Sequence, residues 1–267
     1  MKSKKMIAII QARLGSKRLP SKVLLKIENA PMLYYVVRQV KASELIDDVI
    51  IATTNLPEDD KIIRFCSKLG LQYFRGSSED VLDRYYKCAK KFKCDPVIRI
   101  SADCPLIDPK VIDKTIKKFL KNLYDYVGTN LEKKNGKWIN STCNFPQGMA
   151  VEVASFKTLE KAWKKAKKPS EREHVFPYVQ FNPHLFKVSN IKNGRDLSFV
   201  RCTVDRPEDL EFVRELYKRI SKRKKIVCIS DILKIVKNEP RLLKINNKIP
   251  FDEGYKKSLK NDFRAQK

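Results

Sequence analysis

The stretch MIAIIQARLGSKRLPSKVLLKIENAPMLYYVV, residues 6–37, places an apolar run, a basic turn and a helical pattern in that order. The run at 6–11 has the length and β-branched content of a buried strand, and 31–42 has the apolar period of an amphipathic helix. In the turn between them Gly15 and Ser16 are surrounded by four cations: Arg13, Lys17, Arg18 and Lys22. The stretch therefore predicts a strand that runs into an anion-binding turn and then a helix.

The same order of strand and helix repeats along the first hundred residues. Further strands are predicted at 48–54, 71–76 and 96–101, with helices at 57–69 and 79–92 between them. Such alternation indicates a Rossmann-like, mostly parallel sheet flanked by helices. Ligands of these α/β folds bind at the carboxyl ends of the strands, which is where the basic turn lies.

The second half continues the pattern less regularly. A polar patch at 129–147 is long for a plain connection and is predicted to be a hairpin, a lid or an arm that reaches a partner subunit. The charged tail at 252–267 is predicted to be disordered, and residues 1–251 to be one domain. The remaining predictions are helices at 109–121, 155–167, 170–180 and 206–220 and strands at 124–130, 149–155, 185–191 and 199–204.

Composition restricts the class of protein. The 267 residues are 42% hydrophobic, enough for a core. The formal charge of +26 predicts an anionic partner such as nucleic acid, phosphate-bearing metabolites or a membrane surface. A basic nucleic-acid-binding protein therefore stays an alternative, although the lysines are spread over nearly all predicted helices. Seven cysteines without a CxxC pair favour a reducing cytoplasm. No apolar run is long enough for a signal-peptide core or a membrane span, so we expect neither export by such a signal nor insertion in a membrane.

The basic turn has the chemistry of a phosphate site. Backbone amides at a glycine can point at phosphate oxygens, and the flanking cations neutralise their charge. The spacing matches neither GxxxxGK[ST] nor GxGxxG, which argues against P-loop ATPases and NAD enzymes. A solvated basic turn without a ligand is the alternative.

Two aspartates each follow a predicted strand. Asp103 lies in RISADCPLID and Asp205 in VRCTVDRPEDLEFV. Hard carboxylate oxygens suit Mg²⁺, which takes one or two carboxylates plus substrate phosphates. A turn-forming role for Asp103 and a helix N-cap role for Asp205 are the alternatives. If both face the basic turn, they form a metal-triphosphate site.

Several motifs resemble a known family. IIQARLGSKRLPSKVL, ATTNLPEDD, FRGSSEDVLDRYY, RISADCPLID, EREHVFPYV and CTVDRPEDLEFV occur in this order. Together, over roughly residues 6–220, they resemble the cytidylyltransferase family of spore-coat polysaccharide biosynthesis proteins. That family is related to the acylneuraminate and 3-deoxy-manno-octulosonate cytidylyltransferases.

The resemblance implies a nucleotidyltransferase fold of the glycosyltransferase-A type, CTP, Mg²⁺ and a homodimer. It implies that CMP passes from CTP to a sugar or sugar acid with release of pyrophosphate; a small phosphate or phosphonate is the alternative acceptor. Ala102 and Cys104, which flank Asp103, depart from the family's GDxP-like motif. The implied catalytic residues are Arg13, Lys22, Asp103 and Asp205, the last two as metal ligands.

Recognition of the two substrates is predicted from the same motifs. The nucleotide-binding set is Gln11, Ala12, Arg13, Gly15, Ser16, Arg18, Lys22, Arg75, Ser77, Ser78, Asp80 and Arg84. A plain helix N-cap is the alternative for the part from Ser77 to Asp80, and Arg84 could pair with Asp103 or a phosphate. The predicted acceptor-binding residues are Gln147, Glu152, Arg172 and His174, with His174 as a base or as a structural hydrogen-bonding group.

Overall fold

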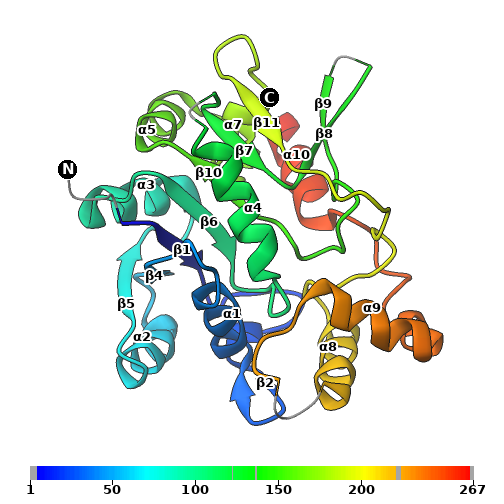
Figure 1. Cartoon of the computed structure of the whole chain (residues 1–267). Coiled ribbons are helices and arrows are strands. Elements are labelled where there is room, and N and C mark those ends of the chain that lie inside the picture. Colours follow the sequence, from blue (N-terminus) through cyan, green and yellow to red (C-terminus); the bar gives the residue numbers. More distant parts are fainter. Residues whose placement is uncertain (1–4, 122, 136, 221–223, 265–267) are drawn as a thin grey trace.

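A seven-stranded sheet forms the centre of the computed structural model, which describes residues 5–121, 123–135, 137–220 and 224–264 (Figure 1). Only β10 runs antiparallel to its neighbours, β6 and β7; the other strands are parallel to one another. The predicted mostly parallel sheet is thus confirmed. Its spatial order is β11 (Val188–Asn190), β7 (Tyr126–Gly128), β10 (Glu152–Ala154), β6 (Val97–Ser101), β1 (Ile7–Gln11), β4 (Asp48–Thr54) and β5 (Gln72–Gly76).

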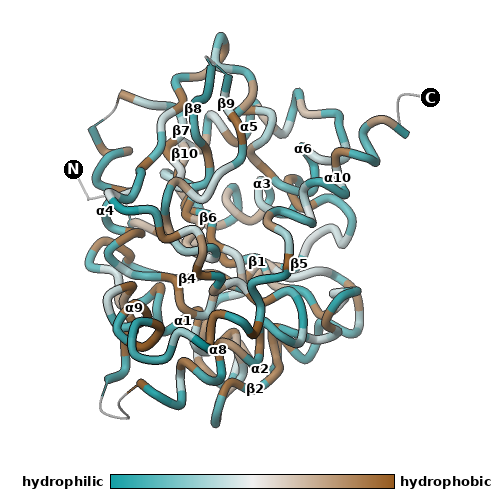
Figure 2. The backbone as a smooth tube through the Cα atoms, turned by 90° about the vertical axis from the view of Figure 1, so that its right-hand side faces the viewer, coloured by the Kyte–Doolittle hydropathy of each residue, from teal (hydrophilic) through white to brown (hydrophobic). Residues whose placement is uncertain are grey.

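Both faces of this sheet are covered by helices. In β1, Ala8 and Ile10 belong to one buried apolar cluster and Ile9 to the other, because successive side chains of a strand point to opposite faces. Figure 2 shows hydrophobic segments along these central strands. The first cluster includes residues of α1 (Met32–Lys41), α2 (Asp60–Lys68), α4 (Pro109–Phe119), α8 (Pro207–Arg219) and α9 (Ile229–Asn238); the second includes residues of α3 (Val81–Phe92), α5 (Phe156–Lys165) and α7 (Pro177–Gln180).

Short elements complete the fold. The polar patch at 129–147 contains the antiparallel hairpin of β8 (Leu131–Lys134) and β9 (Lys137–Asn140), which was one of its predicted forms. A second small sheet pairs β2 (Lys26–Ile27) with β3 (Ala30–Pro31). The 3-10 helices are η1 (Lys22–Leu24), η2 (Pro57–Asp59) and η3 (Pro240–Ile245).

The predicted helix at 170–180 is wrong as one element. It consists of α6 (Pro169–His174) and α7, separated by Val175 at φ 74°. Pro177 opens α7; its ring disfavours helical conformation in the preceding residue and it has no N–H for a continuous helix.

The predicted strand at 199–204 is also wrong, because this segment crosses the ends of the sheet. It makes one isolated bridge, between Arg201 and Gln147. The amide of Val204 donates to the carbonyl of Asp103 at 2.8 Å, just beyond the end of β6. This crossing brings the segment before α8 to the carboxyl ends of the central strands.

The charged tail is helical where it is described, contrary to the predicted disorder. Residues 253–264 form α10 (Glu253–Arg264), which packs against α6; 265–267 lie outside the described residues. Asp262 accepts hydrogen bonds from the amide of Ser170 at 2.8 Å and from its hydroxyl at 2.5 Å. These buried bonds are the physical reason that so polar a segment is ordered. None of the helices in the described ranges has both the length and the apolar character required to cross a bilayer.

Candidate active site

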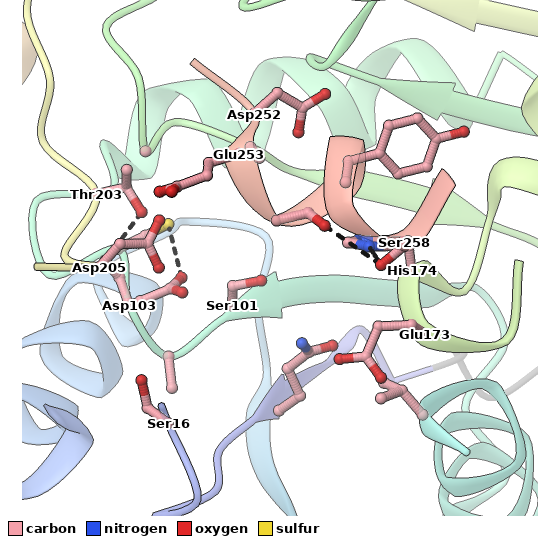
Figure 3. Close-up of a pocket in the computed structure, with 18 of the residues that line it drawn as sticks. Ser16, Ser101, Asp103, Glu173, His174, Thr203, Asp205, Asp252, Glu253 and Ser258 are labelled. Carbon is pink, nitrogen blue, oxygen red and sulfur yellow. Dashed lines mark hydrogen bonds between the residues drawn. The ribbon is translucent and has the colours of Figure 1, made fainter. Parts of the chain in front are cut away.

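A cavity of about 990 Å³ opens where β1 and β6 end. Gln11 and Ser101, the last residues of these strands, are register partners and both line it. Figure 3 shows Ser101, Asp103, Asp205 and Ser16 at this place, with Glu253 and Ser258 of α10 on the other side. The cavity therefore lies at the carboxyl ends of the parallel strands, as predicted.

A buried carboxylate, that of Asp59, holds the backbone of the basic turn in place. Asp59 of η2 accepts a hydrogen bond from the amide of Leu14 at 2.8 Å and is also bonded to Thr54 at the end of β4. The residue of the turn with left-handed backbone is Ser21, at φ 54°, rather than Gly15. A side chain at Gly15 would instead meet Glu58, since an added Cβ would lie 3.2 Å from its Oε1.

Lys22 joins the two aspartates that the sequence singled out. Its Nζ lies 2.8 Å from Oδ2 of Asp103 and 2.9 Å from Oδ1 of Asp205, and it donates to the carbonyl of Val204 at 2.7 Å. Arg18 adds a second cation, 2.7 Å from the same Oδ1 of Asp205. Residues 22, 103 and 205 thus meet at one point although they are far apart in the sequence.

The charges of this cluster support one another. Burial alone would lower the pKa of Lys22, but the charges of Asp103 and Asp205 offset this effect and raise it. Burial likewise opposes ionisation of Asp205, yet Lys22 and Arg18 hold its pKa at about 2. Asp205 is therefore an ionised carboxylate at neutral pH.

The two aspartates form a donor set that suits Mg²⁺. Both carboxylates reach a single cationic nitrogen, so both are directed at one point, and hard oxygen ligands are those that this ion prefers. Among the described residues no cluster of three or more His, Cys, Asp or Glu side chains could hold a metal.

Most predicted site residues line the cavity. The structure brings together Gln11, Ala12, Arg13, Gly15, Ser16, Arg18, Lys22, Arg84, Asp103, Gln147, Arg172, His174 and Asp205. Within this set Arg13 is held by Glu173 at 3.0 Å and by the carbonyl of Ser78 at 3.3 Å. Lys17, which we predicted only as part of the turn, lines the cavity as well.

Of the predicted nucleotide-binding residues at 75–84, Arg84 lines the cavity, whereas Arg75, Ser77, Ser78 and Asp80 do not. Arg75 turns away to Asp60, at 2.8 Å, and to the carbonyls of Thr54 and Leu56. Ser77 and Asp80 cap the start of α3: Asp80 accepts from the amide of Asp83 at 2.9 Å. The N-cap alternative thus describes these residues. Ser78 touches the cavity only indirectly, through the carbonyl that binds Arg13.

Within this segment Arg84 has a hydrogen-bond donor that is not used. It is 1% exposed, lines the cavity, and donates from Nη1 to the carbonyl of Ser77 at 2.7 Å. Its Nε is buried without a hydrogen-bond partner in the described structure. Burial lowers the pKa of this guanidinium. A buried, incompletely paired cation is a strong candidate for contact with an anion or a base carbonyl.

Glu152 acts behind the cavity rather than in its lining. It is 1% exposed and accepts hydrogen bonds from Arg99, from the hydroxyl of Tyr126 at 2.8 Å and from Gln180 at 2.9 Å. Because its oxygens are occupied, the prediction that Glu152 binds the acceptor directly is not supported. Glu152 instead orients Arg99, which lines the cavity. Arg99 also donates a hydrogen bond to Oε1 of Gln11 at 3.2 Å.

The other acceptor candidates are also engaged with protein groups. Arg172 binds Asp80 through Nε at 2.9 Å, so its charge is already paired. His174 shares a hydrogen bond of 3.0 Å with Ser258, and burial followed by the charge of Arg99 lowers its pKa to about 4. A neutral imidazole with so low a pKa is a weak base, which favours the structural role for His174.

Comparison with known proteins assigns the family. Residues 7–249 match the family model described as "Cytidylyltransferase". The chain belongs to the cytidylyltransferase family. It is 40% identical over 247 residues to an uncharacterized protein of Methanocaldococcus jannaschii, covering 92% of this chain and 96% of the relative. It is 30% identical over 239 residues to the spore coat polysaccharide biosynthesis protein SpsF of Bacillus subtilis, covering 87% and 94%.

Solved structures agree with the fold of this cytidylyltransferase. A cytidylyltransferase from Leptospira borgpetersenii matches with a TM-score of 0.82 and 32% identity, covering 90% of this chain and 97% of the other. A CMP:2-keto-3-deoxy-manno-octonic acid synthetase solved with CTP has a TM-score of 0.61 at 19% identity, over 81% and 99%. The second likeness shows the nucleotidyltransferase fold alone.

Several cavity residues of the cytidylyltransferase were missed at the level of sequence. Arg201 is buried, binds Asp209 at 2.8 Å and Asp205 at 3.2 Å, and so orients the latter carboxylate. Arg99 was hidden within a strand pattern. The signal for both was an arginine inside an otherwise apolar β-run, since such a charge is seldom buried without a partner. The lining from α10, at 253–261, carried no recognisable signal because its sequence is that of a solvated tail.

Proposed function

We propose that this cytidylyltransferase transfers CMP from CTP to a hydroxyl group of a sugar or sugar acid in surface-polysaccharide biosynthesis. The acceptor oxygen attacks the α-phosphorus in line, an oxygen–phosphorus bond forms, the hydroxyl proton passes to water, and the bond to the bridging oxygen breaks so that pyrophosphate leaves. The convergence of Lys22, Asp103 and Asp205 beside the basic turn is the observation that carries this proposal.

Triphosphate binding is assigned to the basic turn. Arg13, Arg18 and Lys22 line the same cavity as Ser16 and lie within reach of one anionic ligand that enters it. Arg84 supplies a further buried guanidinium with an unpaired donor. Because the transferred phosphoryl group needs positioning and charge neutralisation more than covalent chemistry, such a cluster accounts for most of the expected catalysis.

Mg²⁺ is proposed as the cofactor, held by Asp103 and Asp205. When bound, it would supply charge neutralisation at the reacting phosphate. Lys22 balances the two carboxylates in the structure, Arg18 and Arg201 fix the orientation of Asp205, and the low pKa of Asp205 keeps this ligand ionised.

The acceptor class follows from the relatives. One relative is named for spore coat polysaccharide biosynthesis, and others are 3-deoxy-manno-octulosonate cytidylyltransferases, 29% identical over half of this chain in one case. We propose a sugar or sugar acid on this basis, together with the cytoplasmic location and the homodimer that the resemblance and the free cysteines suggest.

The proposal is tested by pyrophosphate release from each of the four NTPs with Mg²⁺ and a panel of sugar acids, neutral sugars and small phosphate or phosphonate acceptors. We expect release with CTP and a sugar-type acceptor. Asp205→Asn should lower kcat/KM at least about a hundredfold, since a metal's charge stabilisation is worth several kcal/mol. It should also weaken binding of Mn²⁺ to the CTP-loaded protein, a readout that does not depend on turnover.

Asp196→Asn is the matched control, because Asp196 is exposed and lies outside the cavity. Normal metal binding and turnover in Asp205→Asn would exclude the proposed metal site. Release only with a phosphate or phosphonate acceptor would refute the sugar acceptor, and absence of CTP binding would refute the proposed reaction itself.

A further inference from the structure

Helix α10 presents one side to the cavity. Gly254, Lys257, Ser258 and Asn261 line it, with the i, i+3, i+4 and i+7 spacing of a single helical face. Leu259 and Phe263 are 37% and 72% exposed on the outer side. The polar face of α10 is therefore turned inward, and apolar side chains are left outside.

This helix is fixed along its length, which distinguishes it from a solvated tail. At its start Glu253 binds Arg206 at 2.7 Å, and Asp252 accepts from Asn140 of β9 at 2.9 Å. In its middle Ser258 is bonded to His174, whose ring meets the edge of Tyr255 at a centroid distance of 5.0 Å. At its end Asp262 is bonded twice to Ser170. Figure 2 shows α10 next to α6 at the edge of the molecule.

Helix α10 begins beside the basic turn and runs along the cavity away from it. Glu253 in its first turn lies 3.7 Å from Arg18, a cation of the basic turn. From there the helix continues to Asn261, a distance of about 12 Å at 1.5 Å per residue. In Figure 3, Glu253 lies near Asp205 and Asp103, whereas Ser258 lies farther along the same helix, beside His174 of α6. The inward face of α10 thus begins at the cations of the basic turn and leads away from them.

The chemistry of that face is that of a carbohydrate site. Asn261 offers an amide, which donates and accepts hydrogen bonds. The Ser258 hydroxyl is bonded to His174 at 3.0 Å and to the carbonyl of Gly254 at 3.3 Å, and its oxygen keeps one lone pair to accept from a ligand. His174 beside Ser258 is neutral at pH 7. Asn130, Ser141 and Thr142, from around the hairpin, add similar groups to the lining, and Lys257 adds a cation. The neutral donors and acceptors among these groups match the hydroxyl groups of a sugar.

We propose that the inward face of α10, through Ser258 and Asn261, binds hydroxyl groups of the acceptor and determines which sugar the enzyme uses. The inference rests on the proposed function and deepens it. The family model ends at residue 249, four residues before α10 begins, so this helix lies outside the residues that the model matches.

The experiment compares wild type with the double variant Ser258→Ala/Asn261→Ala in the full-length protein. KM for the acceptor, KM for CTP and kcat are measured by pyrophosphate release with 3-deoxy-manno-octulosonate, N-acetylneuraminate and neutral hexoses as probes; Kd for CTP is measured by calorimetry. Loss of two hydrogen bonds predicts an increase of about ten- to a hundredfold in the acceptor KM, with CTP affinity within twofold of wild type. Lys260→Ala, on the exposed part of the same helix, is the control and should change neither constant.

The outcomes separate this inference from the proposed function. An unchanged acceptor KM in a folded double variant, judged by its Tm, would overturn the inference and leave CMP transfer intact. A selective loss of CTP affinity would also overturn it, because α10 would then belong to the nucleotide site. No turnover of any sugar by the wild-type protein would refute the proposed function and, with it, this assignment.

Discussion

Lys22 shows how one side chain can serve two carboxylates. Its ammonium group is the shared partner of Asp103 and Asp205, which would otherwise repel each other in a partly buried site. Removing one member of such a group leaves an uncompensated charge, which is costly. The same contacts explain why these three residues, read from separate motifs, act together.

His174 is expected to make the free energy of unfolding depend on pH. Its pKa is about 4 in the folded protein and about 6.5 when unfolded, so the unfolded chain binds more protons between these values. The free energy of unfolding should therefore fall as the pH drops below 6.5, by about 2 kcal/mol between pH 7.5 and pH 5. Urea denaturation of wild type and His174→Gln at both pH values gives the loss of stability of each protein. The difference between the two losses is the contribution of His174.

His184→Gln is the matched control, since His184 is exposed. It should lose stability at pH 5 to the same extent as wild type. If His174→Gln did so too, the lowered pKa assigned to His174 would be wrong.

At the scale of elements, short contacts decide where helices begin, end and pack. Pro177 separates α6 from α7, and Asp59 fixes the basic turn through the amide of Leu14. The most consequential case is α10, whose polar sequence has little apolar surface to bury. Its order depends on a few buried polar contacts with α6 and on the ion pairs of Glu253.

Asp262→Ala should release the end of α10. The amide and hydroxyl of Ser170 would lose their buried acceptor, which costs about 1–3 kcal/mol. We expect faster amide hydrogen exchange in 253–264, measured by mass spectrometry, with exchange in β1 and β6 unchanged. Arg264→Ala in the exposed last turn should exchange like wild type; equal protection of α10 in Asp262→Ala would show that other contacts hold it.

In the whole molecule a single sheet, with an apolar cluster on each face, extends from β11 to β5. The single domain with insertions stays a prediction. The hairpin β8–β9 stands out from this body in Figure 1, and it carries Ile139, which is 38% exposed. The polar patch at 129–147, which contains this hairpin, is the segment that we predicted as an arm that could reach a partner subunit.

We predict that the protein sediments as a homodimer and that Ile139→Asp shifts it towards the monomer, because a charge would have to be buried at the interface. Analytical ultracentrifugation over a range of concentrations measures the change. Leu123→Asp, at a side chain that is 59% exposed away from the hairpin, should leave the distribution as in wild type. A wild-type monomer at all concentrations would refute the dimer, and an unaffected Ile139→Asp dimer would exclude the hairpin as its interface.

Local sequence was sufficient for the central strands of the sheet and for many of the residues that line the cavity. Strand periodicity predicted the order of the central elements, and parallel pairing carries any residue that follows a strand to the same edge, as with Asp103 and the basic turn. Sequence could not decide contacts between distant segments. The Lys22–Asp205 pair spans 183 positions, Arg99 is aimed by a partner on another strand, and α10 is ordered by Ser170. Such contacts depend on where folding places each segment, because an arginine or aspartate is otherwise solvated, and an isolated short polar helix is marginal in water, until folding brings a buried partner beside it.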